Sequence, residues 1–272
     1  MQIISLIKID KINQMGKPLI LITNDDGIIA PGIKALIEVA STYGEVVVIA
    51  PDSPQSGQGH AITLNNPLRL QKVNPFGAIE AYSCSGTPVD CIKLAKNLVL
   101  KDRTIDICLS GINHGSNSSI NVIYSGTMSA AMEASLEEID SVGFSLLDHS
   151  FEADFSGAKK VVEQILKKVL AKKFGKCNLL NVNIPSTPYQ DIKGMKICRQ
   201  ADGNWVEKFQ EGIDPSGEKY YWLAGKFVNF DKGQDTDIWA LENGYVSIVP
   251  TGHDLTMHTA IKDFSYLEDK FL

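Results

Sequence analysis

Short β-branched runs alternate with helix-like segments along most of this chain, and this alternation limits the folds open to it. The run Leu19 to Thr23 is apolar almost throughout, as in a strand buried on both faces of a parallel sheet. Pro31 opens a segment with apolar residues at helical spacing, and Glu45 to Ala50 is the next strand-like run. Repeated strand–helix–strand order predicts an α/β fold, a doubly wound and mostly parallel sheet with helices on both faces.

The same alternation continues through the middle of the chain. We predict strands over 105–109, 141–147 and 180–184, and helices over 87–99, 125–138 and 155–173. Thr87 and Pro88 are well suited to begin the first of these helices. These elements extend the parallel sheet, and 272 residues suffice for one large domain or a domain with an appendage.

The pattern changes after about residue 185. Strand-like pieces at 195–200 and 220–227, with a turn at Asp214 to Gly217, predict an antiparallel arm on the main sheet. A helix at 237–242 and a strand at 245–249 return to the core pattern. We expect residues 264–272 to form a short terminal helix.

These patterns divide the chain into three parts. Residues 1–16 form an N-terminal extension without the unbroken apolar core of a secretory signal, and translation could begin at Met1 or Met15. We expect residues 17–190 to form the Rossmann-like core, and residues 191–272 to hold the arm, the returning core strand and the C-terminal helix.

Composition narrows the class of protein. The net charge of -6 argues against a partner that is a nucleic-acid polymer. No apolar run reaches the roughly 18 residues of a membrane span, so we expect no membrane partner. The five cysteines are odd in number, scattered and mostly set in apolar runs, which favours buried thiols in a cytoplasmic protein.

Polar residues follow the predicted strands, where ligands bind in open parallel sheets. Asn24-Asp25-Asp26-Gly27 comes directly after the first strand. Two adjacent carboxylates repel each other, and a hard divalent cation relieves that repulsion. The same four residues are also common in turns, so a metal site and a plain turn are both open readings.

Two longer polar loops should lie at the same edge of the sheet. One spans Pro51 to His60, and the other runs from Ser110 to Thr127 into a predicted helix. The amino end of that helix, after Ser125-Gly126-Thr127, is suited to bind an anion, although Ser125 or Thr127 could simply cap the helix. Carboxylates, hydroxyls and an anion-binding helix end together favour metal-assisted phosphoryl transfer.

Four motifs in this order resemble the SurE family of stationary-phase survival proteins: LITNDDG from Leu21, APDSPQSG from Ala50, SGINHGSN from Ser110 and YSGT from Tyr124. Members of this family are divalent-metal-dependent 5′/3′-nucleotidases with a Rossmann-like core. The resemblance covers the chain from about Lys17 onward. It implies nucleoside monophosphate substrates, and a homodimer or homotetramer assembled through an extended arm and an exchanged C-terminal segment.

The resemblance also implies the site residues. One divalent cation per subunit, Mg²⁺ or Mn²⁺, is expected on Asp25, Asp26, Ser56 and Asn113. The substrate phosphate is expected on Asn113, Ser125, Gly126 and Thr127. Residues with a catalytic role are expected to be Asp25, Asn113, Ser125 and Thr127.

Several other side chains have two interpretations. His60 and His114 could donate to a phosphate or be solvated loop residues. Asp254 and His258 could form a catalytic pair, and we favour an interface hydrogen bond. The aromatic residues of the arm could stack a nucleobase, and we favour packing against a partner subunit: Trp205, Phe209, Tyr220, Tyr221 and Trp222.

Two functions compete. The first is hydrolysis of nucleoside 5′-monophosphates, with 3′-monophosphates as further candidates, to nucleoside and phosphate. The attacking group is then either a water, bound to the metal or oriented by Asp25, or Asp25 itself, through an aspartyl-phosphate. The alternative is a nucleotide-sensing binding module without turnover, which the acid pair disfavours because it sets two negative charges beside an anion.

Overall fold

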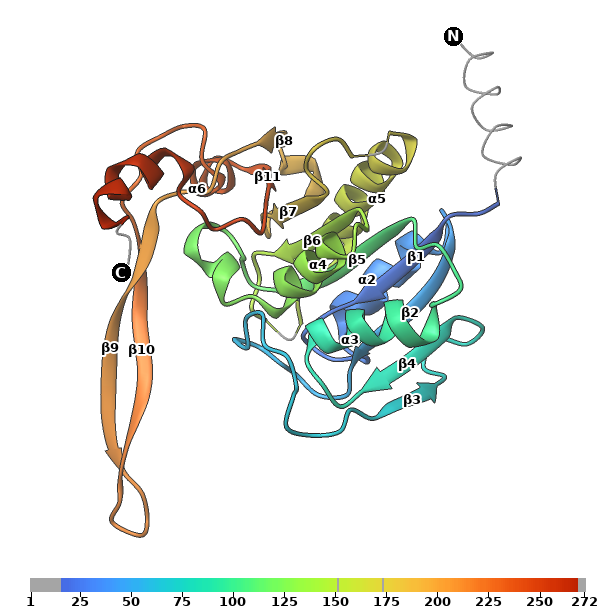
Figure 1. Ribbon diagram of the computed structural model, residues 1–272, viewed down its shortest axis with the longest axis horizontal. Coiled ribbons are helices and arrows are strands. Elements are labelled where there is room, and N and C mark those ends of the chain that lie inside the picture. The colour runs from blue at the N-terminus through green and yellow to red at the C-terminus, as the bar shows by residue number, and fades with distance from the viewer. Residues whose placement is uncertain (1–15, 151, 173, 269–272) are drawn as a thin grey trace.

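A nine-stranded, mostly parallel sheet forms the centre of the protein (Figure 1). The computed structural model describes residues 16–150, 152–172 and 174–268, so the predicted extension lies outside them apart from Gly16. The strands follow one another across the sheet in the order β3-β4-β2-β1-β5-β6-β7-β11-β8. Neighbours from β4 to β7 are parallel, β3 and β11 each run antiparallel to one neighbour, and β8 is parallel to β11.

The element bounds agree well with the sequence pattern. The strands of the main sheet are β1 (Leu19–Thr23), β2 (Glu45–Pro51), β3 (Leu70–Val73), β4 (Glu80–Cys84), β5 (Ile107–His114), β6 (Ser141–Leu146), β7 (Leu179–Ile184), β8 (Gly194–Ile197) and β11 (Tyr245–Pro250). The α-helices are α2 (Pro31–Ala40), α3 (Pro88–Leu94), α4 (Gly126–Leu136), α5 (Ser156–Ala171) and α6 (Asp237–Glu242).

Alternate residues of β1 pack on opposite faces of the sheet. Ile20 and Ile22 belong to a core that includes residues of α2 and α5. Leu19 and Leu21 belong to a second core that includes residues of α3 and α4. Side chains of a strand alternate between faces, so a strand buried on both sides must be apolar throughout, as β1 is. The doubly wound α/β prediction is therefore confirmed.

Two helix starts follow directly from local sequence. Thr87 caps α3 in a capping box with Asp90, in which each side chain accepts a hydrogen bond from the other residue's backbone N–H. Ser125 caps α4 by accepting from the Met128 N–H at 3.0 Å. The α3 helix continues as a π-helical turn over Ala95–Val99, which completes the predicted helix 87–99.

Strand β5 is longer than the sequence pattern indicates. The prediction ended it at Leu109 and gave Ser110 to Thr127 to a loop, but β5 continues to His114. Gly111 has a φ of +120°, and the register with β6 shifts between Ser110 and Asn113. A bulge at a glycine lets the polar continuation stay in the sheet, so Asn113 stands on a strand end.

The arm differs from its prediction in two ways. It is a separate two-stranded antiparallel sheet of β9 (Gly203–Ile213) and β10 (Lys219–Asn229), which projects away from the main sheet (Figure 1). The predicted arm strand at 195–200 instead contributes β8 to the main sheet, parallel to β11. Local strand propensity does not specify the pairing partner, and this caused the error. The turn at Asp214 to Gly217 is confirmed.

Other parts of the chain depart from or complete the prediction. Strands β3 and β4 had no predicted counterpart, because LQKV and EAYSC lack a clear period. The predicted terminal helix is a 3₁₀ helix over His258–Leu267, and its last four predicted residues lie outside the described ones.

All five cysteines are free and four are buried, as expected. In the described part of the chain, each helix is too short or too polar to cross a membrane.

Candidate active site

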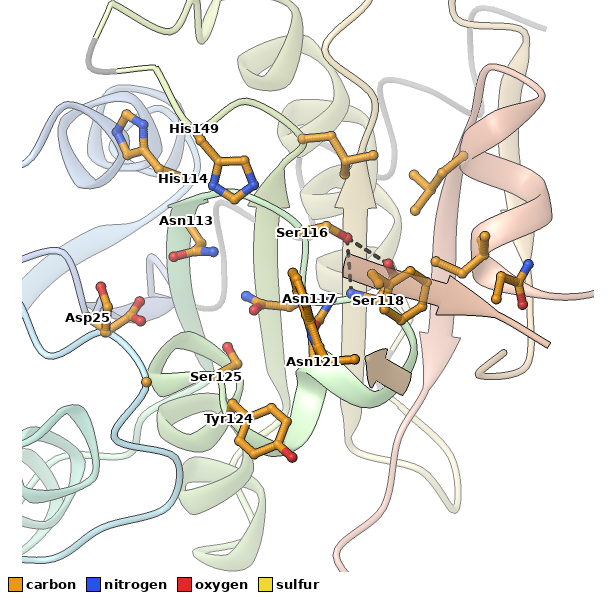
Figure 2. A pocket seen from close by; sticks show the side chains of 18 of the residues that line it. Asp25, Asn113, His114, Ser116, Asn117, Ser118, Asn121, Tyr124, Ser125 and His149 are labelled. Atoms are coloured by element: carbon orange, nitrogen blue, oxygen red, sulfur yellow. Dashed lines mark hydrogen bonds between the residues drawn. The ribbon is translucent and has the colours of Figure 1, made fainter. Parts of the chain in front are cut away.

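Four of the seven predicted site residues meet around one cavity at the carboxyl edge of the parallel strands, while Asp26, Gly126 and Thr127 lie next to them outside its lining. The cavity has a volume of about 760 Å³. Asp25, Ser56, Asn113 and Ser125 line it, and Figure 2 shows Asp25, Asn113 and Ser125 gathered on one side. Residues from β1, β5, the loop after β2 and the start of α4 thus converge, as the position of polar loops after strands predicts.

Asp25 is buried against the amino end of α4. Its Oδ1 accepts a hydrogen bond from the Thr127 hydroxyl. A Cβ added at Gly126 would lie 2.7 Å from the Asp25 Cβ and 2.9 Å from its Oδ2. A side chain at Gly126 would therefore displace the carboxylate, which explains the need for glycine at this position. Thr127 itself is fully buried behind Asp25 and outside the cavity lining.

The two adjacent carboxylates are electrostatically unfavourable when both are ionised. Burial raises the pKa of Asp25 to about 6, and repulsion from Asp26 contributes further, while hydrogen bonds from Thr127 act in the opposite direction. Burial also raises the pKa of Asp26, against the effect of His114. A cation beside this pair would remove the unfavourable energy.

Two of the other predicted oxygen donors, Asn113 and Ser56, line the same cavity, and Asp26 lies beside Asp25 outside the lining. The Asn113 amino group donates to the Gly115 carbonyl at 2.9 Å, and Figure 2 shows its amide oxygen on the side of Asp25. Asp26 accepts from the His114 backbone N–H at 3.4 Å. Ser56 is exposed in a loop that is tied to the segment after β1, because the Gln55 N–H donates to the Asp25 carbonyl at 2.7 Å.

The chemistry of this donor set fits a hard cation. It consists of two carboxylates, an amide oxygen and a hydroxyl, all oxygen ligands of the kind that Mg²⁺ and Mn²⁺ prefer. Within residues 16–150, 152–172 and 174–268, no three His, Cys, Asp or Glu side chains cluster as a metal site. Amide and hydroxyl oxygens would therefore have to complete the ligands of a metal held beside Asp25 and Asp26.

Of the three histidines singled out in the sequence, His114 lines the cavity, whereas His60 and His258 do not. His114 lines the cavity and packs edge-on against Phe155, with ring centroids 5.1 Å apart. His60 is directed instead to Glu133, with its Nε2 2.9 Å from Oε2. His258 pairs with Asp254 on the surface at 2.7 Å, outside the cavity lining.

Sequence reasoning missed part of the cavity wall. Trp205 and Phe227, at the base of the arm, line the same cavity, and the Trp205 indole donates to Asn121 at 2.8 Å. Behind the Ser116 to Ser118 segment lie the buried side chains of Asn181 and Asn183. Their signal in the sequence was two asparagines at alternate positions of the otherwise apolar strand LLNVNI.

Comparison with known proteins identifies the family. Residues 20–207 match the model of the family described as survival protein SurE. This chain belongs to the SurE family.

SurE proteins from several bacteria resemble the chain over most of its length. It is 57% identical to the protein named 5′-nucleotidase SurE from Cytophaga hutchinsonii, over 94% of this chain and 100% of that one. It is 58% identical to the protein of the same name from Flavobacterium psychrophilum, over 91% and 96% of the two chains. The crystal structure of the SurE protein from Aquifex aeolicus superimposes with a TM-score of 0.81 at 40% identity, covering 93% of this chain and 100% of that one.

Proposed function

We propose that this chain is a 5′-nucleotidase, a cytoplasmic phosphomonoesterase that hydrolyses nucleoside 5′-monophosphates, with 3′-monophosphates as further candidates. The observation that carries the proposal is the adjacent acid pair, in which Asp25 is buried at the wall of a cavity that a nucleotide could enter and Asp26 is half-buried beside it. Membership of the SurE family supports the reaction type, since relatives at 57% and 58% identity are named 5′-nucleotidases.

The same proposal assigns one divalent cation, Mg²⁺ or Mn²⁺, to each subunit. Asp25, Asp26, Ser56 and Asn113 would hold it, because they offer only oxygen ligands. When bound, the cation supplies charge neutralisation for the phosphoryl group and a lowered pKa for water.

The chain's own residues have distinct tasks. Thr127 holds the Asp25 carboxylate in one orientation through its hydroxyl, so that Asp25 can orient the attacking water. Ser125, Gly126 and Asn113 lie where the positive end of α4 can bind phosphoryl oxygens. Attack by Asp25 itself is the competing mechanism, and acid quenching with a labelled substrate would trap its phosphoenzyme.

The alternative of a nucleotide-sensing module has less support. A phosphate binder gains nothing from two carboxylates beside its anion, whereas metal-assisted hydrolysis requires them. The relatives' names also describe enzymes.

Assembly into a homodimer or homotetramer completes the proposal. The arm exposes large apolar side chains on both strands, including Phe209, Trp222 and Leu223, and residues 255–267 expose several more. Exposed apolar surface of this extent is typical of subunit contacts. The arm and the C-terminal segment are therefore the proposed contact region.

Phosphate release from a panel of nucleoside 5′- and 3′-monophosphates, measured with and without chelator, tests the function. We expect release that chelator abolishes and that Mg²⁺ or Mn²⁺ restores. Unchanged release in excess chelator would contradict the metal site, and tight nucleotide binding without release would favour the sensing module.

A further inference from the structure

Asn181 and Asn183 on β7 hydrogen-bond the backbone of Asn117, which lines the cavity. The Asn117 N–H donates to the Asn183 Oδ1 at 2.8 Å. The Asn183 amino group donates to the Asn181 Oδ1 at 2.9 Å, and the Asn181 amino group donates to the Asn117 carbonyl at 2.8 Å. These three hydrogen bonds form a closed ring that satisfies both polar backbone groups of Asn117, and we call it the asparagine ring.

The same segment is held at further points. The Asn117 amino group donates to the buried Ser145 hydroxyl at 2.8 Å, so its amide oxygen is the group left to offer a ligand. Two residues on, Ser119 has a φ of +53°, which is unfavourable for serine. Its N–H donates to the buried Asp237 at 2.8 Å. A segment constrained this way by buried polar groups is preorganised, at a cost in stability that indicates function.

The position of the segment indicates what it meets. Ser116, Asn117 and Ser118 line the cavity between the acid pair and the aromatic residues Trp205 and Phe227. Figure 2 shows these three residues farther along the wall from Asp25 than Asn113 is. A nucleotide with its phosphate beside Asp25 and its base toward Trp205 and Phe227 would place its sugar along this stretch. The Asn117 amide oxygen, beside the Ser116 and Ser118 hydroxyls that hydrogen-bond each other at 2.6 Å, suits a group that carries hydroxyls.

We infer that the Ser116 to Ser118 segment binds the ribose of the substrate, and that Asn181 and Asn183 are positioning residues that fix it for this contact. The inference rests on the proposed nucleotidase function. Neither asparagine lines the cavity, so both act through the segment, by way of the Asn117 backbone and, for Asn183, also the Ser116 hydroxyl at 3.3 Å. Loss of the ring frees the segment and weakens sugar binding, while the phosphate end stays intact.

The test compares Asn181→Leu with the matched variant Asn178→Leu. Asn181→Leu deletes the hydrogen bond from Asn181 to the Asn117 carbonyl at 2.8 Å and the one that Asn181 accepts from Asn183 at 2.9 Å. Asn178→Leu deletes an amide–carbonyl hydrogen bond of the same length next to β7, from Asn178 to Ser135 at 2.8 Å. The substrates are a nucleoside 5′-monophosphate, ribose 5-phosphate, which keeps the sugar alone, and p-nitrophenyl phosphate, which lacks it. Circular dichroism verifies folding.

Asn181→Leu should lower kcat/KM for both ribose-containing substrates roughly 10-fold, mainly through KM, and leave p-nitrophenyl phosphate within about twofold. Asn178→Leu should leave all three substrates within about twofold. An equal loss on all three substrates for Asn181→Leu would indicate a general structural role and overturn the inference. A loss on the nucleotide but not on ribose 5-phosphate would also overturn it, because the segment would then contact the base.

A second variant covers the case in which Asn181→Leu does not fold, and the wild-type substrate profile tests the proposed function itself. If Asn181→Leu does not fold, Ser145→Ala, which removes only the partner of the Asn117 amino group, should raise KM for the ribose-containing substrates selectively. No selective change in that variant would overturn the inference. Wild-type protein that cleaves p-nitrophenyl phosphate but not nucleotides would overturn the proposed function, and the inference with it, before any variant is compared.

Discussion

Thr127 donates a hydrogen bond to the Asp25 carboxylate across 102 positions of sequence. The contact joins the end of β1 to the first turn of α4, and it commits the Thr127 hydroxyl to a protein group. Thr127 therefore acts on the proposed chemistry by orienting Asp25, and the backbone at the start of α4 remains the group suited to bind phosphate.

Asp25→Asn should abolish hydrolysis while the fold remains, because it removes a charge that holds the cation and orients water. Thr127→Ala should reduce activity by roughly 10- to 100-fold, the effect of one hydrogen bond to a charged group. Steady-state kinetics with circular dichroism compares the two variants. Greater residual activity in Asp25→Asn than in Thr127→Ala would contradict both assignments.

Asp25→Asn should also stabilise the metal-free protein at pH 7. Burial and the Asp26 charge raise the pKa of Asp25 to about 6, so its ionised form is unfavourable in the folded state. Asparagine keeps the acceptor for Thr127 and removes the charge. Thermal unfolding in chelator should therefore show a higher Tm for the variant, and a lower Tm would show that the carboxylate is not under electrostatic stress.

Gly126→Ala should inactivate the protein more than its matched control. The added Cβ would lie 2.7 Å from the Asp25 Cβ and shift the carboxylate, with a loss of activity on the order of 100-fold. Gly157, in the first turn of α5, has only ordinary contacts at 3.7 Å, so Gly157→Ala should leave kcat/KM unchanged. Equal activity of the two variants would show that the close approach of α4 to Asp25 is unimportant.

Glu133→Gln should alter the pH dependence of stability. Hydrogen bonds from His60 and Lys93 lower the pKa of Glu133 below 4.5 in the folded protein. The stabilisation is therefore complete above the unfolded-state pKa and is lost as pH falls through the lower folded-state pKa. The difference in unfolding free energy between wild type and variant should be largest near pH 7 and shrink below about pH 4.5, as urea titrations can measure.

Glu163, a carboxylate on the surface, is the matched control for Glu133. Hydrogen bonds from Lys167 and Tyr43 also lower the pKa of Glu163, but this carboxylate is exposed. Glu163→Gln should therefore change stability less at every pH. A pH-independent gap for Glu133→Gln would contradict the assigned role of its charge.

Phe209→Ser/Leu223→Ser should weaken assembly. The two residues face each other across the arm and are 61% and 64% exposed, so they offer apolar area to a partner. Light scattering should show a shift to smaller species, whereas Leu98→Ser, at an exposed position outside the arm, should leave the mass unchanged. A monomeric wild-type protein at micromolar concentration would contradict the proposed assembly.

Local sequence determined the core of the fold and the position of the acid pair. The apolar run of β1 and the helical spacing after Pro31 report burial directly, because side-chain period follows from backbone geometry. Asp25 and Asp26 could be placed at the carboxyl edge because they follow the last residue of β1. Ser125 was a candidate helix cap for a similar local reason.

Only the tertiary structure decided which distant groups meet. Strand β8 joins β11, Thr127 binds Asp25, and Asn181 and Asn183 enclose Asn117. Each of these contacts depends on strand order and register, which local periodicity does not encode, since the same strand pattern fits several neighbours. The raised pKa of Asp25 has the same origin, because burial by α4 comes from packing and not from the residues beside it in sequence.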